Sequence, residues 1–87
     1  MTRDLLTKIA KYKEVLYSKT NQDEIIFDYG EEIQVGDNLV IYGIYLSGKN
    51  WFVKLHAEVA DCHMDMNMDC LSDIILGRIL NILMKKL

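Results

Sequence analysis

The sequence contains no proline and only two cysteines, Cys62 and Cys70, among its 87 residues. Two cysteines cannot supply the multiple-disulfide framework that stabilises many small secreted domains. The five glycines are scattered, which excludes a phosphate-binding loop and a dinucleotide fingerprint. The longest apolar stretch, residues 74–87, is interrupted by polar and basic side chains and is too short to span a bilayer. These absences favour a protein that neither spans a membrane nor binds nucleotides.

The length and the balance of residue types are typical of one folded domain, which we expect to comprise residues 1–87. Hydrophobic residues make up 51% of the chain and charged residues 26%, as in ordinary folded proteins. The first residues include no apolar segment of the kind that a signal peptide contains. We therefore expect a cytoplasmic protein.

Charge is distributed unevenly along the chain, which carries a net charge of −3. Residues 1–20 have a net charge of +3, whereas residues 21–38 carry six acidic side chains and no basic one. Residues 61–73 add four aspartates. Binding to a phosphate backbone requires a positive field on the docking face, so this distribution argues against nucleic acid as a partner. An acidic surface is instead suited to a basic protein.

Periodicity predicts an α+β fold with an N-terminal helix, a three- to four-stranded antiparallel meander and a C-terminal helix packed on the sheet. Apolar residues at helical spacing predict a helix over residues 3–18, with Thr2 as its N-cap. Residues 24–29, 33–35, 39–46 and 51–59 are rich in β-branched and aromatic residues. Residues 39–46 look apolar on both faces, which is typical of a strand that is covered on both sides or lies against a partner. Residues 61–70 are expected to be an irregular connection.

A second helix is predicted over residues 71–86, capped by Asp69 or Ser72. Its apolar side chains cover a wider arc of the helix than packing on one side requires. If the additional apolar side chains are exposed, they would form an association surface. The alternative is that the first helix and the long connection cover this excess. The sequence predicts that the interface of a homodimer, or of a complex with another protein, is formed by Ile75, Ile79, Leu80, Leu83 and Leu87.

Sulfur-containing and acidic residues are concentrated in residues 61–70. The spacing fits neither a zinc site with two ligand pairs nor an EF-hand loop, which needs glycine where Cys70 stands. Thioether and thiolate ligands would suit Cu(I). The candidate ligands for such a site are Cys62, His63, Met64, Met66, Met68 and Cys70. The favoured interpretation is that the alternating methionines pack inward as core residues, so that no metal or cofactor is predicted.

Some stretches resemble parts of small uncharacterised single-domain proteins of gut bacteria and their mobile elements. The resemblance is carried by Ile41-Tyr42-Gly43-Ile44-Tyr45-Leu46, by Gly48, and by residues 51–55 and 71–83. It covers about half of the chain and implies no activity.

The leading hypothesis from the sequence is a non-enzymatic protein-interaction module that self-associates. It would do so through the C-terminal helix or the exposed face of residues 39–46. One alternative is a small acidic inhibitor or adaptor of a basic host or mobile-element protein. The other is a Cu(I)- or thiol-sensing protein that uses residues 62–70. Two histidines and two cysteines without further context do not indicate a catalytic site.

Overall fold

The computed structural model describes residues 2–87, with side chains from Arg3 onward. The N-cap expected of Thr2 therefore concerns a side chain outside the described residues. The chain divides into two compact units, a helical unit of residues 1–23 and 71–87 and a sheet unit of residues 24–70. The α+β class, the order of elements and the antiparallel sheet are confirmed.

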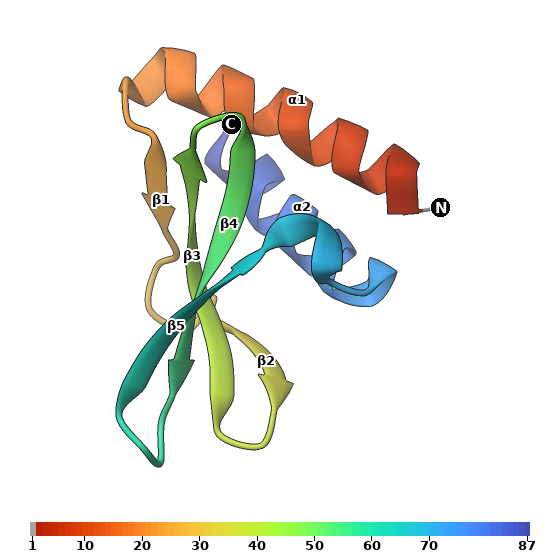
Figure 1. Cartoon of the computed structure of the whole chain (residues 1–87). Coiled ribbons are helices and arrows are strands. Elements are labelled where there is room, and N and C mark those ends of the chain that lie inside the picture. Colours follow the sequence, from red (N-terminus) through yellow and green to blue (C-terminus); the bar gives the residue numbers. More distant parts are fainter. Residues whose placement is uncertain (1) are drawn as a thin grey trace. The chain divides into compact units, whose positions relative to one another are not determined.

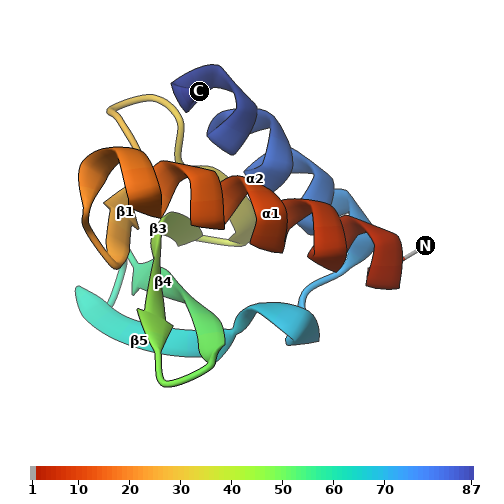
Figure 2. The ribbon, with the colours of Figure 1, turned by 90° about the horizontal axis from the view of Figure 1, so that it is seen from above.

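The helical unit consists of α1 (Thr2–Thr20) and α2 (Asp73–Lys86), which pack against each other (Figure 2). Ser72 is the N-cap of α2, and its hydroxyl accepts a hydrogen bond from the Ile75 backbone N–H at 3.4 Å. Asp73 in the first turn and two lysines in the last turn complement the helix dipole. Between residues 2 and 87, neither helix combines the length and the apolar character needed to cross a bilayer.

The sheet unit contains five strands and one short 3-10 helix (Figure 1). The strands are β1 (Glu24–Ile26), β2 (Ile33–Gly36), β3 (Leu39–Ser47), β4 (Asn50–Ala57) and β5 (Cys62–Asn67). They are paired in the order β1-β3-β4-β5, and β2 pairs with residues 39–41 of β3 on the edge that also pairs with β1. Every pairing is antiparallel.

The prediction of an irregular connection over residues 61–70 was wrong. Residues 62–67 form β5, which raises the number of strands to five, and Met68–Cys70 form the 3-10 helix. Polar and sulfur-containing side chains do alternate in this segment: Cys62, Met64 and Met66 are each followed by one polar residue, in the order His63, Asp65 and Asn67. Its high content of aspartate and asparagine, which are depleted in strands, concealed the pattern. Pairing with β4 overrides that low propensity.

Of the two arrangements predicted for residues 39–46, cover of β3 on both faces within this chain was wrong. Its apparently continuous apolar run is interrupted by a register shift between Ile41 and Gly43 in the pairing with β4. Ile41 and Ile44 are both fully buried although three positions separate them. A β-bulge inserts one extra residue and so reverses the alternation of faces beyond it. The strand therefore has one buried and one partly exposed face.

Close approach of β1 explains why glycine occupies position 43. A Cβ atom on Gly43 would lie 2.9 Å from the Ile25 carbonyl oxygen and 3.0 Å from the Ile26 Cδ1 atom. Such separations are shorter than van der Waals contact allows, so any larger residue would push β1 away from β3.

Candidate functional site

The bulge in β3 places a group of aromatic and polar side chains on one exposed face of the sheet. On β3 these are Val40, Tyr42 and Tyr45, while Ile41 and Ile44 point to the buried face. Strand pairing adds Phe52, Lys54 and His56 from β4, and His63 and Asp65 from β5. We call these eight residues the open face.

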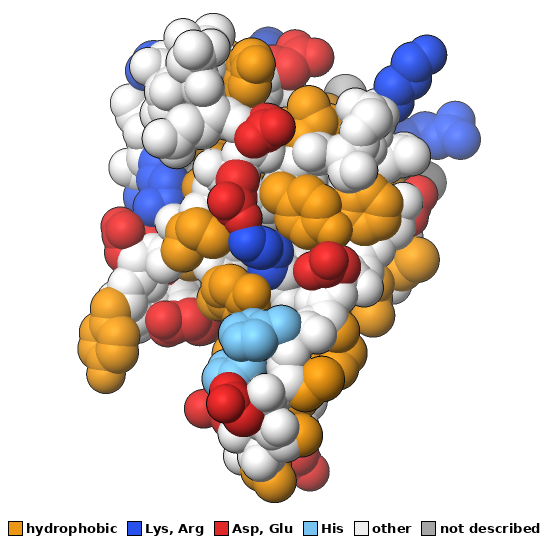
Figure 3. Space-filling view, turned by 60° about the vertical axis from the view of Figure 1, so that its left-hand side comes forward, with side chains coloured by type: hydrophobic (Ala, Val, Ile, Leu, Met, Phe, Trp, Pro, Cys, Tyr) orange, Lys and Arg blue, Asp and Glu red, His pale blue; other side chains and the backbone are white. Residues whose placement is uncertain are grey.

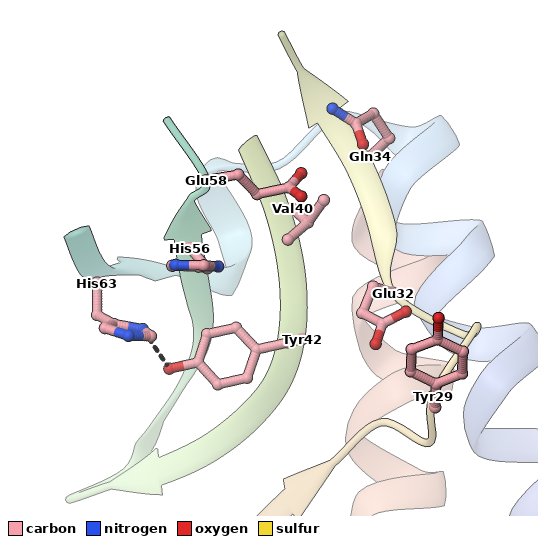
Figure 4. A pocket seen from close by; sticks show the side chains of 8 residues that line it. All are labelled: Tyr29, Glu32, Gln34, Val40, Tyr42, His56, Glu58 and His63. Carbon is pink, nitrogen blue, oxygen red and sulfur yellow. Dashed lines mark hydrogen bonds between the residues drawn. The ribbon is translucent and has the colours of Figure 1, made fainter. Parts of the chain in front are cut away.

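A cavity of about 480 Å³ lies at one end of the open face (Figure 4). Val40, Tyr42, His56 and His63 line one side of it, and Tyr29 and Glu32 from the segment between β1 and β2 lie opposite the two histidines (Figure 4). Gln34 and Glu58 complete the lining. Its walls therefore combine two phenol rings with two carboxylates, which is a suitable environment for an organic cation.

Two histidines and one aspartate form a compact cluster beside this cavity. His56 on β4 pairs directly with His63 on β5, and their rings stack with centroids 4.6 Å apart. The Oδ1 atom of Asp61 lies 3.1 Å from the Nε2 atom of His56. Asp61 occupies the turn between the two strands with a φ of 48°, a conformation that aspartate tolerates better than most residues. Figure 3 shows the two histidines, in pale blue, side by side with acidic groups next to them.

Tyr42 connects this cluster to the centre of the sheet. Its hydroxyl lies 3.2 Å from the Nδ1 atom of His63, and the two rings meet edge to face. One potential ligand atom from each of His56, Asp61 and His63 lies within 4.8 Å of the others. Imidazole nitrogen and carboxylate oxygen are common ligands of divalent transition metals. The cluster therefore brings together three potential ligands of such an ion.

The remainder of the open face forms a network centred on Lys54. Its ammonium group pairs with Glu24 and lies within about 6 Å of the ring centroids of Tyr42 and Tyr45. The hydrogen bond to Glu24 raises the pKa of Lys54 above its usual value. The Tyr45 hydroxyl donates to Asp65 Oδ2 at 2.9 Å, and this hydrogen bond raises the pKa of the phenol. Lys54 is thus already engaged with carboxylate and aromatic groups.

The six candidate soft-metal ligands do not all lie on one face of β5. Cys62, Met64 and Met66 alternate along β5 with His63, so they point to the face opposite the histidine cluster. Met64 and Met66 pair with Leu55 and Val53 on that face and remain 43% and 39% exposed. Met68 is buried and Cys70 is exposed, and both belong to the 3-10 helix that follows β5. Only His63 belongs to the cluster described above.

The residues predicted to form an interface on α2 lie mostly in the interior. Ile79, Leu80 and Leu83 are buried within the chain, Ile75 is half-buried, and Leu87 is exposed. The apolar side chains exposed on α2 and at its C-cap are Ile74, Met84 and Leu87. A contact between copies through α2 would therefore involve these three residues, because buried side chains cannot reach a second molecule.

The two units carry opposite net charges. Side chains of the sheet unit include nine acidic residues and two lysines, which gives −7, with histidine counted as neutral. Side chains of the helical unit include eight basic and four acidic residues, which gives +4. The open face and its cavity belong to the strongly acidic unit, so their electrostatic field attracts cations.

Sequence reasoning missed His56, Asp61 and Tyr42 as members of one site. The direct pairing of His56 with His63 requires β5, and the position of Tyr42 requires the bulge. Alternation of residues 62–67 was the one signal that could have indicated a strand here.

No family model, no curated protein and no solved structure matches this chain.

Proposed function

We propose that this protein is a non-enzymatic interaction module that binds a basic segment of another protein at the cavity of its open face. The observation that carries the proposal is the placement of Glu32, Glu58, Tyr29 and Tyr42 around one cavity in a unit with a net charge of −7. Carboxylates form charge-assisted hydrogen bonds with lysine and arginine, and tyrosine rings attract the same cations.

The cavity is better suited to one lysine or arginine side chain of a partner, together with the residues adjacent to it in the partner's sequence, than to a large apolar ligand. Tyr29 is fully exposed at its rim, so a partner can cover an aromatic ring that this chain leaves in water. Aromatic residues covered on complex formation contribute strongly to binding. In this function the protein would act as an acidic adaptor or inhibitor of a basic partner. We place it in the cytoplasm, where the exposed, free thiols of Cys62 and Cys70 would stay reduced.

Binding of a short fluorescent peptide rich in lysine and arginine tests this function. Fluorescence anisotropy is expected to show saturable binding that weakens as salt is raised, and no binding of an acidic peptide of equal length. Glu58→Gln and Glu32→Gln should each weaken binding by about 3- to 5-fold, the size expected for loss of one exposed charge contact. Gln at position 32 retains an oxygen that can accept the hydrogen bond from the Gly30 N–H.

Asp37→Asn is the matched control. Asp37 is an exposed acidic residue of the same unit but does not line the cavity, so its replacement removes the same charge from the same unit. We expect it to change the affinity by less than about twofold. Equal losses in all three variants would mean that the peptide responds to the overall field, and the cavity would then not be the binding site.

Self-association is a second candidate. It is favoured by the opposite charges of the two units and by three exposed apolar residues on α2 and at its C-cap, Ile74, Met84 and Leu87. The acidic unit of one copy complements the basic unit of another, and the three apolar residues would add a contact from which water is excluded. Sedimentation at several concentrations should then show a dimer that Ile74→Asp dissociates. A monomer at every concentration would exclude this candidate.

A further inference from the structure

We propose that His56, Asp61 and His63 form a binding site for a late first-row divalent metal ion such as Zn²⁺. The three side chains come from β4, the following turn and β5, and one ligand atom from each lies within 4.8 Å of the others. Two imidazoles and one carboxylate form a ligand set that Zn²⁺ shares with Ni²⁺ and Cu²⁺. A fourth position would remain for water.

The distances are close to those that coordination requires. Ligand atoms bound tetrahedrally at Zn²⁺ distances lie about 3.3 Å apart. The Asp61 Oδ1 and His56 Nε2 atoms already lie 3.1 Å apart. Closing the remaining separations from at most 4.8 Å requires a movement of about 1.5 Å or less. Asp61 and His63 are both exposed, so rotation of their side chains can supply this movement without rearranging the core.

Tyr42 supplies the supporting hydrogen bond that ligating histidines usually have. When the Nδ1–H group of His63 donates to the Tyr42 oxygen, at 3.2 Å, the Nε2 atom carries a lone pair and is free to bind metal. Tyr42 lies next to the bulge of β3, which is the strand at the centre of the sheet. The hydrogen bond therefore connects His63 to a residue on a central strand.

A metal ion at this position would fasten the edge of the sheet. Among the residues that the structure describes, β5 pairs only with β4, and five of its six residues are exposed. Ligands from β4, the turn and β5 would join the two strands through the ion. Because a ligand that binds only the folded hairpin stabilises it, metal binding should increase the protection of β5 amides from hydrogen exchange.

The alternative is a surface hydrogen bond between His56 and Asp61 beside two stacked rings, an arrangement that contributes little to stability and binds nothing. A second alternative is binding through the exposed Cys62 thiol, which is adjacent to His63 in the sequence. Each alternative predicts a different effect of single substitutions on the affinity for Zn²⁺ than the proposed site does.

Titration of the full chain with Zn²⁺ by calorimetry tests the site. We expect one ion per chain, and a loss of affinity of about tenfold or more in Asp61→Asn and in His63→Gln. Asp65→Asn is the matched control, because Asp65 is an exposed aspartate of the same open face outside the cluster. It should change the affinity by less than about twofold. Circular dichroism of each variant verifies that it is folded.

Cys62→Ser separates nitrogen and oxygen ligation from thiolate ligation. We expect this variant to bind Zn²⁺ as the parent does, and the Co²⁺-loaded protein to lack a thiolate-to-metal charge-transfer band. Loss of binding in Cys62→Ser, an intense charge-transfer band, equal effects of Asp61→Asn and Asp65→Asn, or no binding at all would each overturn the proposal. The titration contains no peptide, so its result is independent of the proposed binding of a basic partner.

Discussion

His56 and His63 lie directly opposite each other on β4 and β5, and their imidazole planes are inclined by only 16°. Directly opposed residues on one face of an antiparallel pair are the closest side-chain neighbours that a sheet provides. The same register places Lys54 opposite Asp65 and Phe52 opposite Asn67. One strand pairing thus assembles most of the polar surface that the protein presents on its open face.

Gly43→Ala should destabilise the sheet unit. The added Cβ atom would lie 2.9 Å from a backbone oxygen of β1, which cannot move independently of the strand. We expect a loss of about 1–3 kcal/mol in the free energy of unfolding, as for other overpacked positions. Chemical denaturation measures it.

Gly77→Ala is the control for that substitution. Gly77 lies inside α2, and a Cβ atom there would have no heavy atom within 4 Å. Because alanine is the better helix former, this variant should be more stable by up to about 1 kcal/mol. A stable Gly43→Ala variant with unchanged amide shifts in β1 would show that β1 does not approach β3 as described.

Leu83→Ala should lower stability rather than weaken association. Leu83 is fully buried in α2, so its truncation leaves a cavity that costs about 2–5 kcal/mol. Ile74 belongs to the same helix and is 72% exposed, and Ile74→Ala should change stability by less than about 0.5 kcal/mol. Thermal denaturation of both variants compares the two positions. The opposite ranking would support the sequence-based interface, in which Leu83 faces a second molecule.

Lys13 should make the stability of the protein depend on pH above neutrality. Only 3% of its surface is exposed, and burial lowers the pKa of its amine from the ordinary 10.5 to about 7. Between these two values the unfolded chain retains a proton that the folded protein releases. Stability therefore rises with pH from about 7 to about 10.5, and below pH 7 the contribution is constant and unfavourable.

Lys13→Met should flatten this dependence, because methionine carries no amine that releases a proton on folding. Lys11→Met is the control, since Lys11 is exposed on the same helix and its loss should leave the pH dependence intact. Urea denaturation at several pH values between 7 and 10 measures both slopes. Equal slopes in the parent and in Lys13→Met would contradict the burial of a largely neutral amine.

The helices, the hairpin of β3 and β4 and the antiparallel arrangement could be predicted because local patterns determine them. Apolar spacing indicated α1, and Ser72 was one of the two caps expected for α2. The bulge in β3 could not be predicted, because it depends on how β1 and β4 pair with the strand. A run that looks apolar on both faces is ambiguous between a fully covered strand and one with reversed alternation.

The candidate site was less predictable than the fold, since it depends on contacts between distant segments. Tyr42 and His63 are 21 positions apart and meet only after β4 pairs with both β3 and β5. The hypothesis of sulfur ligands named Cys62, Met64 and Met66, which lie on the other face of β5. Composition identified the segment that contains His63, and strand pairing determined which of its side chains share a face with His56.

Zn²⁺ should weaken the binding of a basic peptide if both proposed sites exist as described. His56 and His63 line the cavity that also contains Glu32 and Glu58, so a bound ion would place two positive charges beside the position of the peptide cation. Two ligands that disfavour each other do so reciprocally, and we expect each to reduce the affinity of the other by about 5-fold or more. Peptide anisotropy with and without saturating Zn²⁺ measures the coupling.

The Asp61→Asn variant, with its weakened metal site, should bind the peptide with little response to the same Zn²⁺ concentration, whereas Asp65→Asn should respond as the parent does. Unchanged peptide affinity in Zn²⁺-saturated parent protein would place the peptide away from the histidine side of the cavity.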